Sequence, residues 1–143
     1  MAPPPAPRSP SRLLGRAAIM VLAGLGGVVG LFGGLQVTRV LAWGPLHVSV
    51  GAIAAFVANA GFGALGAWGL RSRDAALAPG VGWFLVTLGL LFLPHPGGDI
   101  VVPQSGGDAI AFLVLGFAGI GLAGYLASRI VPRPASPRGP ARR

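Results

Sequence analysis

Few side chains in this sequence are suited to chemistry, and Asn59 is the first of them. It stands near the middle of an apolar stretch, residues 48–70, where a carboxamide must find hydrogen-bond partners or carry the cost of an unsatisfied polar group. Such a residue either lines a small polar path or joins two helices by a hydrogen bond, and the second role is the more common. Thr87 is the other polar residue in a comparable position. Neither is ionisable, which disfavours a pump or a proton-coupled transporter.

The second group of candidates is His95, Asp99 and Asp108, together with His47, all in segments between apolar stretches. Two imidazoles and two carboxylates could bind a divalent metal, but their spacing matches no ligand motif such as HExxH. We therefore expect exposed loop residues and no metal or cofactor, with Asp108 as the N-cap of the helix that follows it. Ser49 has neither a nucleophile elbow nor a credible triad, so we do not expect an enzyme.

Four apolar stretches that are each long enough to cross a lipid bilayer must position these residues. At about 1.5 Å of rise per residue, ~20 helical residues match a hydrocarbon core of ~30 Å. The 143 residues are 53% hydrophobic and 10% charged, whereas soluble domains average roughly 25% charged residues. The sequence predicts an all-α membrane protein with four transmembrane helices in an antiparallel bundle. The spans are expected at about residues 17–35, 48–70, 75–93 and 109–127.

The domain organisation follows from the positions of proline. Tails 1–12 and 132–143 are proline-rich and are expected to be disordered, leaving residues 13–131 as one transmembrane domain. A cleaved signal peptide is not expected, because the first apolar run exceeds the usual ~7 to 15 residues and no A-x-A site follows it closely. Pro45 suits the first turn of a helix, so the second helix should begin there. Cysteine is absent, which excludes disulfides and thiolate chemistry.

The charge distribution predicts the orientation. The net charge is +8, and ten of the eleven basic residues, all arginines, precede the first span, separate the second from the third, or follow the fourth. Arg39 alone lies on the other side, so both termini are expected in the cytoplasm. Topology and attraction to anionic lipid headgroups explain the charge better than nucleic-acid binding does. Abundant Ala, Gly, Pro and Arg without lysine suggest a GC-rich bacterial genome, hence a bacterial plasma membrane.

Small residues recur at intervals that place them on single helix faces. Such faces let a neighbouring helix approach closely. The fourth span carries small faces on two sides, and in the second span the small residues share their stripe with the carboxamide. The packing candidates are Gly26, Gly30, Gly34, Asn59, Gly63, Gly116, Gly119 and Gly124.

The segment APGVGWFLVTLGLLFLPHPGGDIVVP, residues 78–103, resembles a family of small, uncharacterised four-helix membrane proteins from high-GC Gram-positive bacteria. The shared features are a tryptophan-bearing third helix, a proline-interrupted exit and the GGD that follows. The resemblance implies an inner-membrane four-helix protein and supplies no activity or catalytic residue.

Two functions remain open. The first is a non-enzymatic structural or accessory subunit whose glycine faces pack against each other, a second copy of the chain or a larger membrane partner. The second is a small transporter or channel component with a path near Asn59 and the outer loop from His95 to Asp108. The lack of ionisable residues within the spans favours the first.

Overall fold

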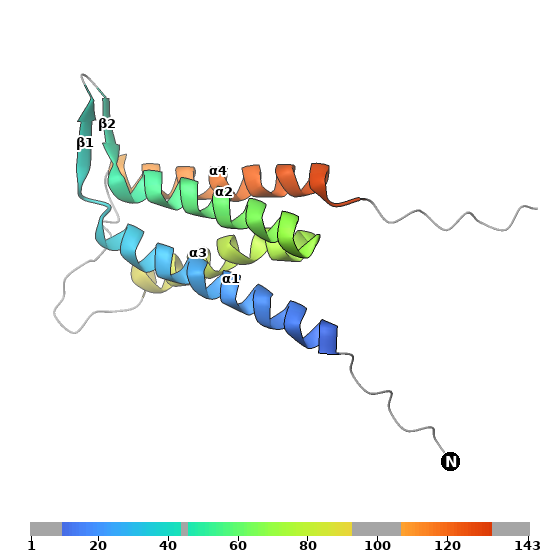
Figure 1. The fold of residues 1–143 in the computed structure, drawn as a ribbon. Coiled ribbons are helices and arrows are strands. Elements are labelled where there is room, and N and C mark those ends of the chain that lie inside the picture. The colour runs from blue at the N-terminus through green and yellow to red at the C-terminus, as the bar shows by residue number, and fades with distance from the viewer. Residues whose placement is uncertain (1–9, 44–45, 93–106, 133–143) are drawn as a thin grey trace, which may run out of the picture.

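The computed structural model describes residues 10–43, 46–92 and 107–132, so His95, Asp99 and most of both tails lie outside the described residues (Figure 1). Each of its four long helices is apolar enough and long enough to cross a membrane. The elements in chain order are α1 (Pro10–Leu35), β1 (Val40–Trp43), β2 (Leu46–Ser49), α2 (Val50–Leu70), α3 (Arg73–Phe92) and α4 (Gly107–Ile130).

Successive helices run in alternating directions (Figure 1). The start of α1, the α2–α3 turn and the end of α4 lie at one end of the molecule, and the β1–β2 ribbon lies at the other. The α2–α3 turn is tight because Arg71 adopts a left-handed conformation with φ 46°, an unusual geometry for a residue other than glycine. Helices α1 and α3 form one close pair, and α2 and α4 form the second.

The connection between α1 and α2 differs from the prediction. Instead of a helix that begins at Pro45, an antiparallel hairpin pairs Val40 with Ser49 and Trp43 with Leu46. The physical reason lies in Ser49, whose extended backbone and side chain cap α2, so that the helix begins at Val50. This two-stranded ribbon is an addition to the predicted all-α architecture, whose four long helices are otherwise present among the described residues.

Ser49 also fixes the hairpin to the end of α1. Its hydroxyl donates to the Val37 carbonyl oxygen at 2.8 Å, and its Oγ accepts from the Ala52 amide at 3.4 Å. The Val50 amide donates to the Arg39 carbonyl oxygen at 2.8 Å. Ser49 and Val37 are fully buried, so this connection is part of the packed structure.

One further helix boundary, the start of α4, differs from expectation, and one proline lies within a helix. Asp108 lies inside the first turn of α4 and not at its cap, because the helix already begins at Gly107. There the carboxylate faces the positive end of the helix dipole. Pro79 lies inside α3, which begins at Arg73. Its ring leaves the Ala75 carbonyl without a helical donor, and that carbonyl lies directly against Gly66 of α2.

Small residues make up most of the interior, together with the rings of Trp83 and Phe112, and most large apolar residues point outward. Phe92, Met20 and Trp68 are 76%, 73% and 72% exposed. The buried stripe of α2 follows the predicted four-residue spacing through Gly51, Ala55, Asn59, Gly63 and Ala67. A water-soluble protein would bury its large apolar side chains, whereas this arrangement suits helices surrounded by lipid.

Candidate functional site

Asn59 joins the two helices of the α2–α4 pair. Its side chain is 1% exposed, and its Nδ2 donates to the Gly116 carbonyl oxygen at 3.3 Å. This contact requires close helices, and glycine supplies the space: a Cβ atom at Gly119 would lie 2.6 Å from the Phe56 carbonyl oxygen and 3.1 Å from the Asn59 Cβ. The carboxamide therefore acts as an interhelical hydrogen-bond donor, while its Oδ1 has no partner among the described residues.

Trp83 of α3 lies on the other side of Gly116 and is fully buried. A Cβ atom at Gly116 would fall on the six-membered part of its indole ring. The ring also packs against Phe112, with centroids 5.4 Å apart, and edge-on against Phe117 at 5.5 Å. Gly116 is thus the point at which α2, α3 and α4 meet.

Two further polar atoms in this interior have no hydrogen-bond partner among the described residues: Nε1 of Trp83 and Oγ1 of Thr87, which follows one helical turn later and is 1% exposed. Unpaired buried polar atoms are uncommon and often mark a position for water or for a polar ligand atom. The buried polar side chains of the described residues are Ser49, Asn59 and Thr87, none of which is ionisable. Among the described residues this interior therefore supplies hydrogen-bonding groups and no ionisable side chain.

The central role of Trp83 was not predicted from the sequence, in which it served only as part of a family resemblance. A signal was present. Gly80 and Gly82 precede the tryptophan within one helical turn, and small neighbours let a large ring and the adjoining backbone pack closely. In the structure a Cβ atom at Gly80 would lie 2.6 Å from Cγ1 of Ile120, and one at Gly82 would fall on the Ala23 carbonyl oxygen.

The glycine candidates of α1 pack mainly against α3. A Cβ atom at Gly26 would overlap the Pro79 backbone, and one at Gly30 would lie 2.9 Å from the Trp83 carbonyl oxygen. Gly34 is also buried. The predicted glycine face of α1 is therefore occupied within the chain itself.

The remaining candidates lie on α2 and α4. Gly63 contacts Ala123 of α4 and approaches the Ala76 carbonyl oxygen of α3, which would lie 2.6 Å from an added Cβ atom. Gly124 is half-buried, and its nearest neighbour in the same test is Cδ2 of Leu77, at 3.8 Å. Gly63 is thus at a tight crossing, whereas Gly124 has ordinary van der Waals room.

The outer-loop candidates are not brought together by what the structure describes. Asp108 is half-buried in the first turn of α4, and His95 and Asp99 are outside the described ranges. Within residues 10–43, 46–92 and 107–132, no three His, Cys, Asp or Glu side chains form a group suited to a metal ion.

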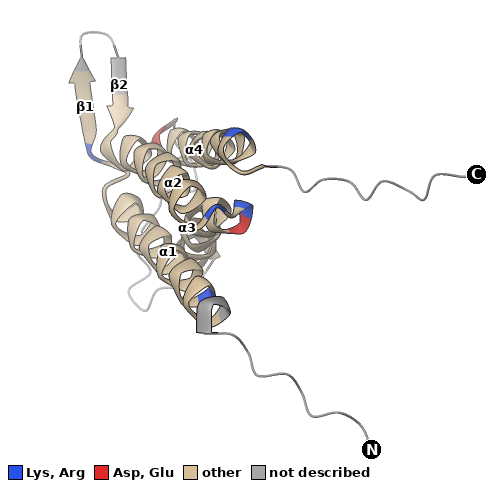
Figure 2. Cartoon of the chain, turned by 45° about the vertical axis from the view of Figure 1, so that its right-hand side comes forward, with Lys and Arg blue, Asp and Glu red and all other residues tan. Residues whose placement is uncertain are grey.

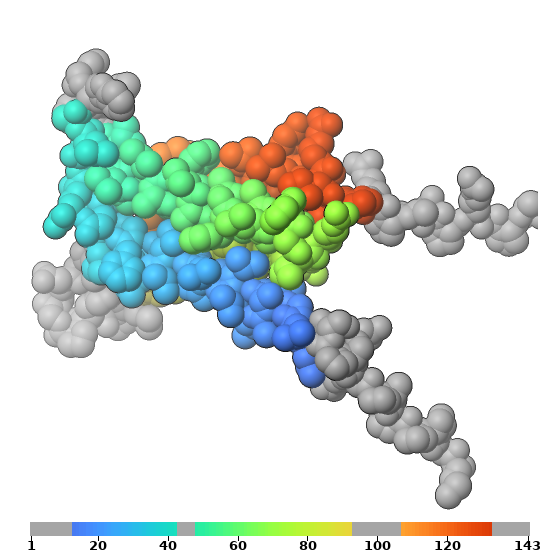
Figure 3. Space-filling view, in the orientation of Figure 1, coloured from blue at the N-terminus to red at the C-terminus, as the bar shows by residue number. Residues whose placement is uncertain are grey.

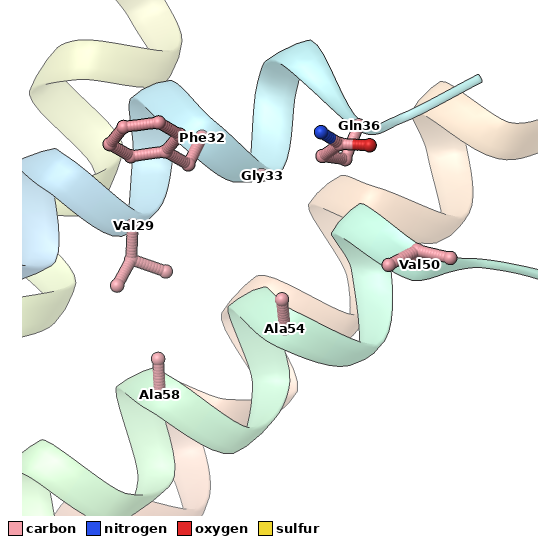
Figure 4. Close-up of a pocket in the computed structure, with 7 residues that line it drawn as sticks. All are labelled: Val29, Phe32, Gly33, Gln36, Val50, Ala54 and Ala58. Atoms are coloured by element: carbon pink, nitrogen blue, oxygen red, sulfur yellow. The ribbon is translucent and has the colours of Figure 1, made fainter. Parts of the chain in front are cut away.

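A pocket of about 190 Å³ opens between α1 and α2 near the hairpin end (Figure 4). Its lining is apolar except for Gln36, which lies at the end of α1. The lining residues are Val29, Phe32, Gly33, Gln36, Val50, Ala54 and Ala58. The pocket suits an apolar chain and contains no titratable group.

Comparison with family models, with curated proteins and with solved structures finds no match to this chain. The resemblance of residues 78–103 to a family of small membrane proteins therefore stays a prediction, and function must be argued from the residues themselves.

Proposed function

We propose that this chain is a non-enzymatic, multi-pass protein of the bacterial plasma membrane that acts as a structural or accessory subunit. The observation that carries the proposal is the composition of the helix interior. It is closed by glycine contacts and by two large aromatic rings, Trp83 and Phe112, and its buried polar side chains are all uncharged. An interior of this kind stabilises an arrangement of helices and offers no reactive group.

The topology belongs to the same proposal. The four helices form an antiparallel bundle, with both termini in the cytoplasm. Arg16 lies near the start of α1, Arg71 and Arg73 at the α2–α3 turn, Arg129 in the last turn of α4, and Arg39 directly before β1. Figure 2 shows most of the basic positions at the end where the termini emerge. Arginine near the ends of transmembrane helices favours the cytoplasmic side, which supports this orientation.

The glycine faces determine how a partner would bind. Gly26, Gly30, Gly63 and Gly116 are occupied by neighbouring helices of the same chain. A second copy or a larger membrane protein must therefore contact the outward faces, where positions such as Gly121 have no neighbouring atom within 4 Å. Cross-linking in native membranes should recover a defined partner or a self-oligomer, and recovery of neither would contradict an accessory role.

A second candidate function, a small transporter or channel component, is favoured by the unpaired polar atoms of Asn59, Trp83 and Thr87. A water-filled path through the interior would need polar atoms of this kind to bind water or a solute. Four helices enclose little volume, however, so a lumen would have to arise by association of several copies.

Replacement of Asn59 by Leu distinguishes the two functions. Under the structural proposal, the variant loses the bond to Gly116 and about 0.6 to 2 kcal/mol of stability. Proteoliposomes of the wild type and of the variant should then be no more permeable to ions and small solutes than protein-free liposomes. Wild-type permeability that Asn59→Leu abolishes, while the protein stays folded by circular dichroism, would establish the conducting role instead.

A further inference from the structure

The helices diverge at the end of the molecule where the termini emerge. The start of α1 separates from the end of α2 (Figures 1 and 3), and a groove lies between these two segments. The groove has a volume of about 770 Å³, within the range of roughly 300–1,000 Å³ that is usual for ligand sites. Its lining residues are Leu14, Gly15, Arg16, Ala18, Ile19, Gly69, Leu70 and Ser72.

The groove combines apolar walls with one cation. Leu14, Ile19 and Leu70 supply hydrocarbon surface, and Arg16 is the charged side chain among the lining residues. Arg16 is exposed, and its side chain forms no hydrogen bond or ion pair with the part of the chain that the structure describes. Its planar group of five N–H donors is therefore free to bind a phosphate.

Ser72 adds a hydroxyl to the same groove. Its Oγ accepts a hydrogen bond from the Ala75 amide at 3.4 Å, and its proton remains available to a phosphate oxygen. The surrounding charge is also favourable, because Arg71 and Arg73 adjoin the groove in the chain and Asp74 is the one acidic residue in that turn. An anion is thus favoured at the rim, and an apolar chain is favoured along the walls.

We infer that this groove is a binding site for one anionic phospholipid. The phosphate binds Arg16 and Ser72, and an acyl chain lies along Leu14, Ile19 and Leu70. Basic pockets between transmembrane helices on the cytoplasmic side bind anionic headgroups by the same combination of contacts. The inference rests on the membrane placement proposed above. It assigns the lipid to one particular site, whereas general attraction to a charged bilayer would involve no particular site.

The charge of the site is tested by native mass spectrometry of the full-length protein in detergent. The protein is titrated with phosphatidylglycerol and with phosphatidylcholine of the same acyl chains. The first phosphatidylglycerol should bind about fivefold more tightly than phosphatidylcholine, the effect of one well-placed arginine. Arg16→Gln should remove this preference. Arg73→Gln, the matched control, makes the same charge change outside the groove lining and should retain most of it.

The shape of the site is tested without a change of charge. Gly69 lines the groove, and a Cβ atom there meets no atom within 4 Å, so Gly69→Leu adds a bulky side chain to the groove wall without a clash inside the chain. The substitution should weaken the first binding step for both lipids at least about fivefold. Gly61→Leu is the matched control, because Gly61 is an equally open glycine of α2 outside the groove. It should bind both lipids as the wild type does.

Two outcomes would overturn the inference. Equal losses of preference in Arg16→Gln and Arg73→Gln would mean that the attraction is diffuse, and wild-type binding by Gly69→Leu would mean that the lipid binds elsewhere. Failure of the membrane placement has a different signature, because the protein would then stay monodisperse in buffer without detergent. A membrane-extracted protein that lacks lipid preference would contradict this site alone.

Discussion

At the scale of single residues, Gly116 of α4 contacts two other helices at one position. Its carbonyl oxygen accepts the hydrogen bond from Asn59, and its Cα faces the ring of Trp83. These contacts come from two different helices. Because glycine has no side chain, α2 and α3 can both approach α4 at this position. A methyl group at this position must displace either the indole or a whole helix.

Gly116→Ala should therefore lower the free energy of unfolding by about 1–3 kcal/mol, the usual cost of overpacking. The measurement is unfolding in mixed micelles titrated with sodium dodecyl sulfate and followed by circular dichroism. Gly121→Ala in the same helix is the control, because a Cβ atom there meets nothing within 4 Å. Its stability should be unchanged or raised by up to about 1 kcal/mol. Equal effects of the two substitutions would show that Trp83 does not pack against Gly116.

At the scale of the elements, the α1–α3 pair is held by backbone contacts that run in both directions. Gly26 of α1 lies against the Pro79 carbonyl, and Gly82 of α3 lies against the Ala23 carbonyl. Carbonyl oxygens cannot rotate away as a side chain can. Any substitution at these glycines must separate the helices.

Gly26→Ala should accordingly cost about 3 kcal/mol, the upper end of the range for overpacking and more than Gly116→Ala. Because Gly26→Ala and Gly82→Ala separate the same two helices, the double variant should lose less than the sum of the single losses, by at least about 0.5 kcal/mol. The detergent unfolding assay measures all three variants. Gly24→Ala, an open position on the same helix, should behave as the wild type does. Full additivity would contradict a shared interface.

The sequence was sufficient to predict the four helices, because a long apolar run has few alternatives in lipid, where every backbone group must be bonded internally. It also predicted the stripe through Asn59, since four-residue spacing defines one helix face. The β1–β2 hairpin could not be predicted from spacing, because Pro45 is equally suited to a helix start and to a turn. What decided between them was Ser49, a cap whose hydroxyl bonds to Val37 twelve residues earlier.

The burial of Trp83 was not predicted for a related reason: the glycines beside it are a local signal, but they do not show which helix the ring packs against. Tryptophan in a membrane span usually marks the interface with water, and Trp68 is indeed exposed near the end of α2. Only the pairing of helices shows that Gly116 leaves room for the ring of Trp83, while Gly30 leaves room for the Trp83 backbone. The pairing depends on contacts between residues far apart in the chain, on which local periodicity carries no information.

At the scale of the whole molecule, the two ends differ in charge and in shape. One end holds the diverging start of α1, the α2–α3 turn and most of the described arginines, and the other holds the hairpin and Arg39 (Figure 2). The proposed topology, with arginine kept in the cytoplasm, places the hairpin outside. Under that proposal the inferred lipid groove at Arg16 faces the inner leaflet, where anionic lipids and the basic turn lie at the same depth.

Because the chain contains no cysteine, a single introduced thiol reports on this orientation without background. Thr38 beside the hairpin and Ser128 in the last turn of α4 are both exposed, and neither substitution by cysteine changes the charge that directs insertion. A membrane-impermeant maleimide should label Thr38→Cys in intact cells and Ser128→Cys only after the membrane is opened. The reverse pattern would place the arginine-rich end outside and contradict both the proposed topology and the inner-leaflet position of the lipid groove. Labelling of both thiols in intact cells would mean that the helices do not separate two compartments, which contradicts insertion across the membrane altogether.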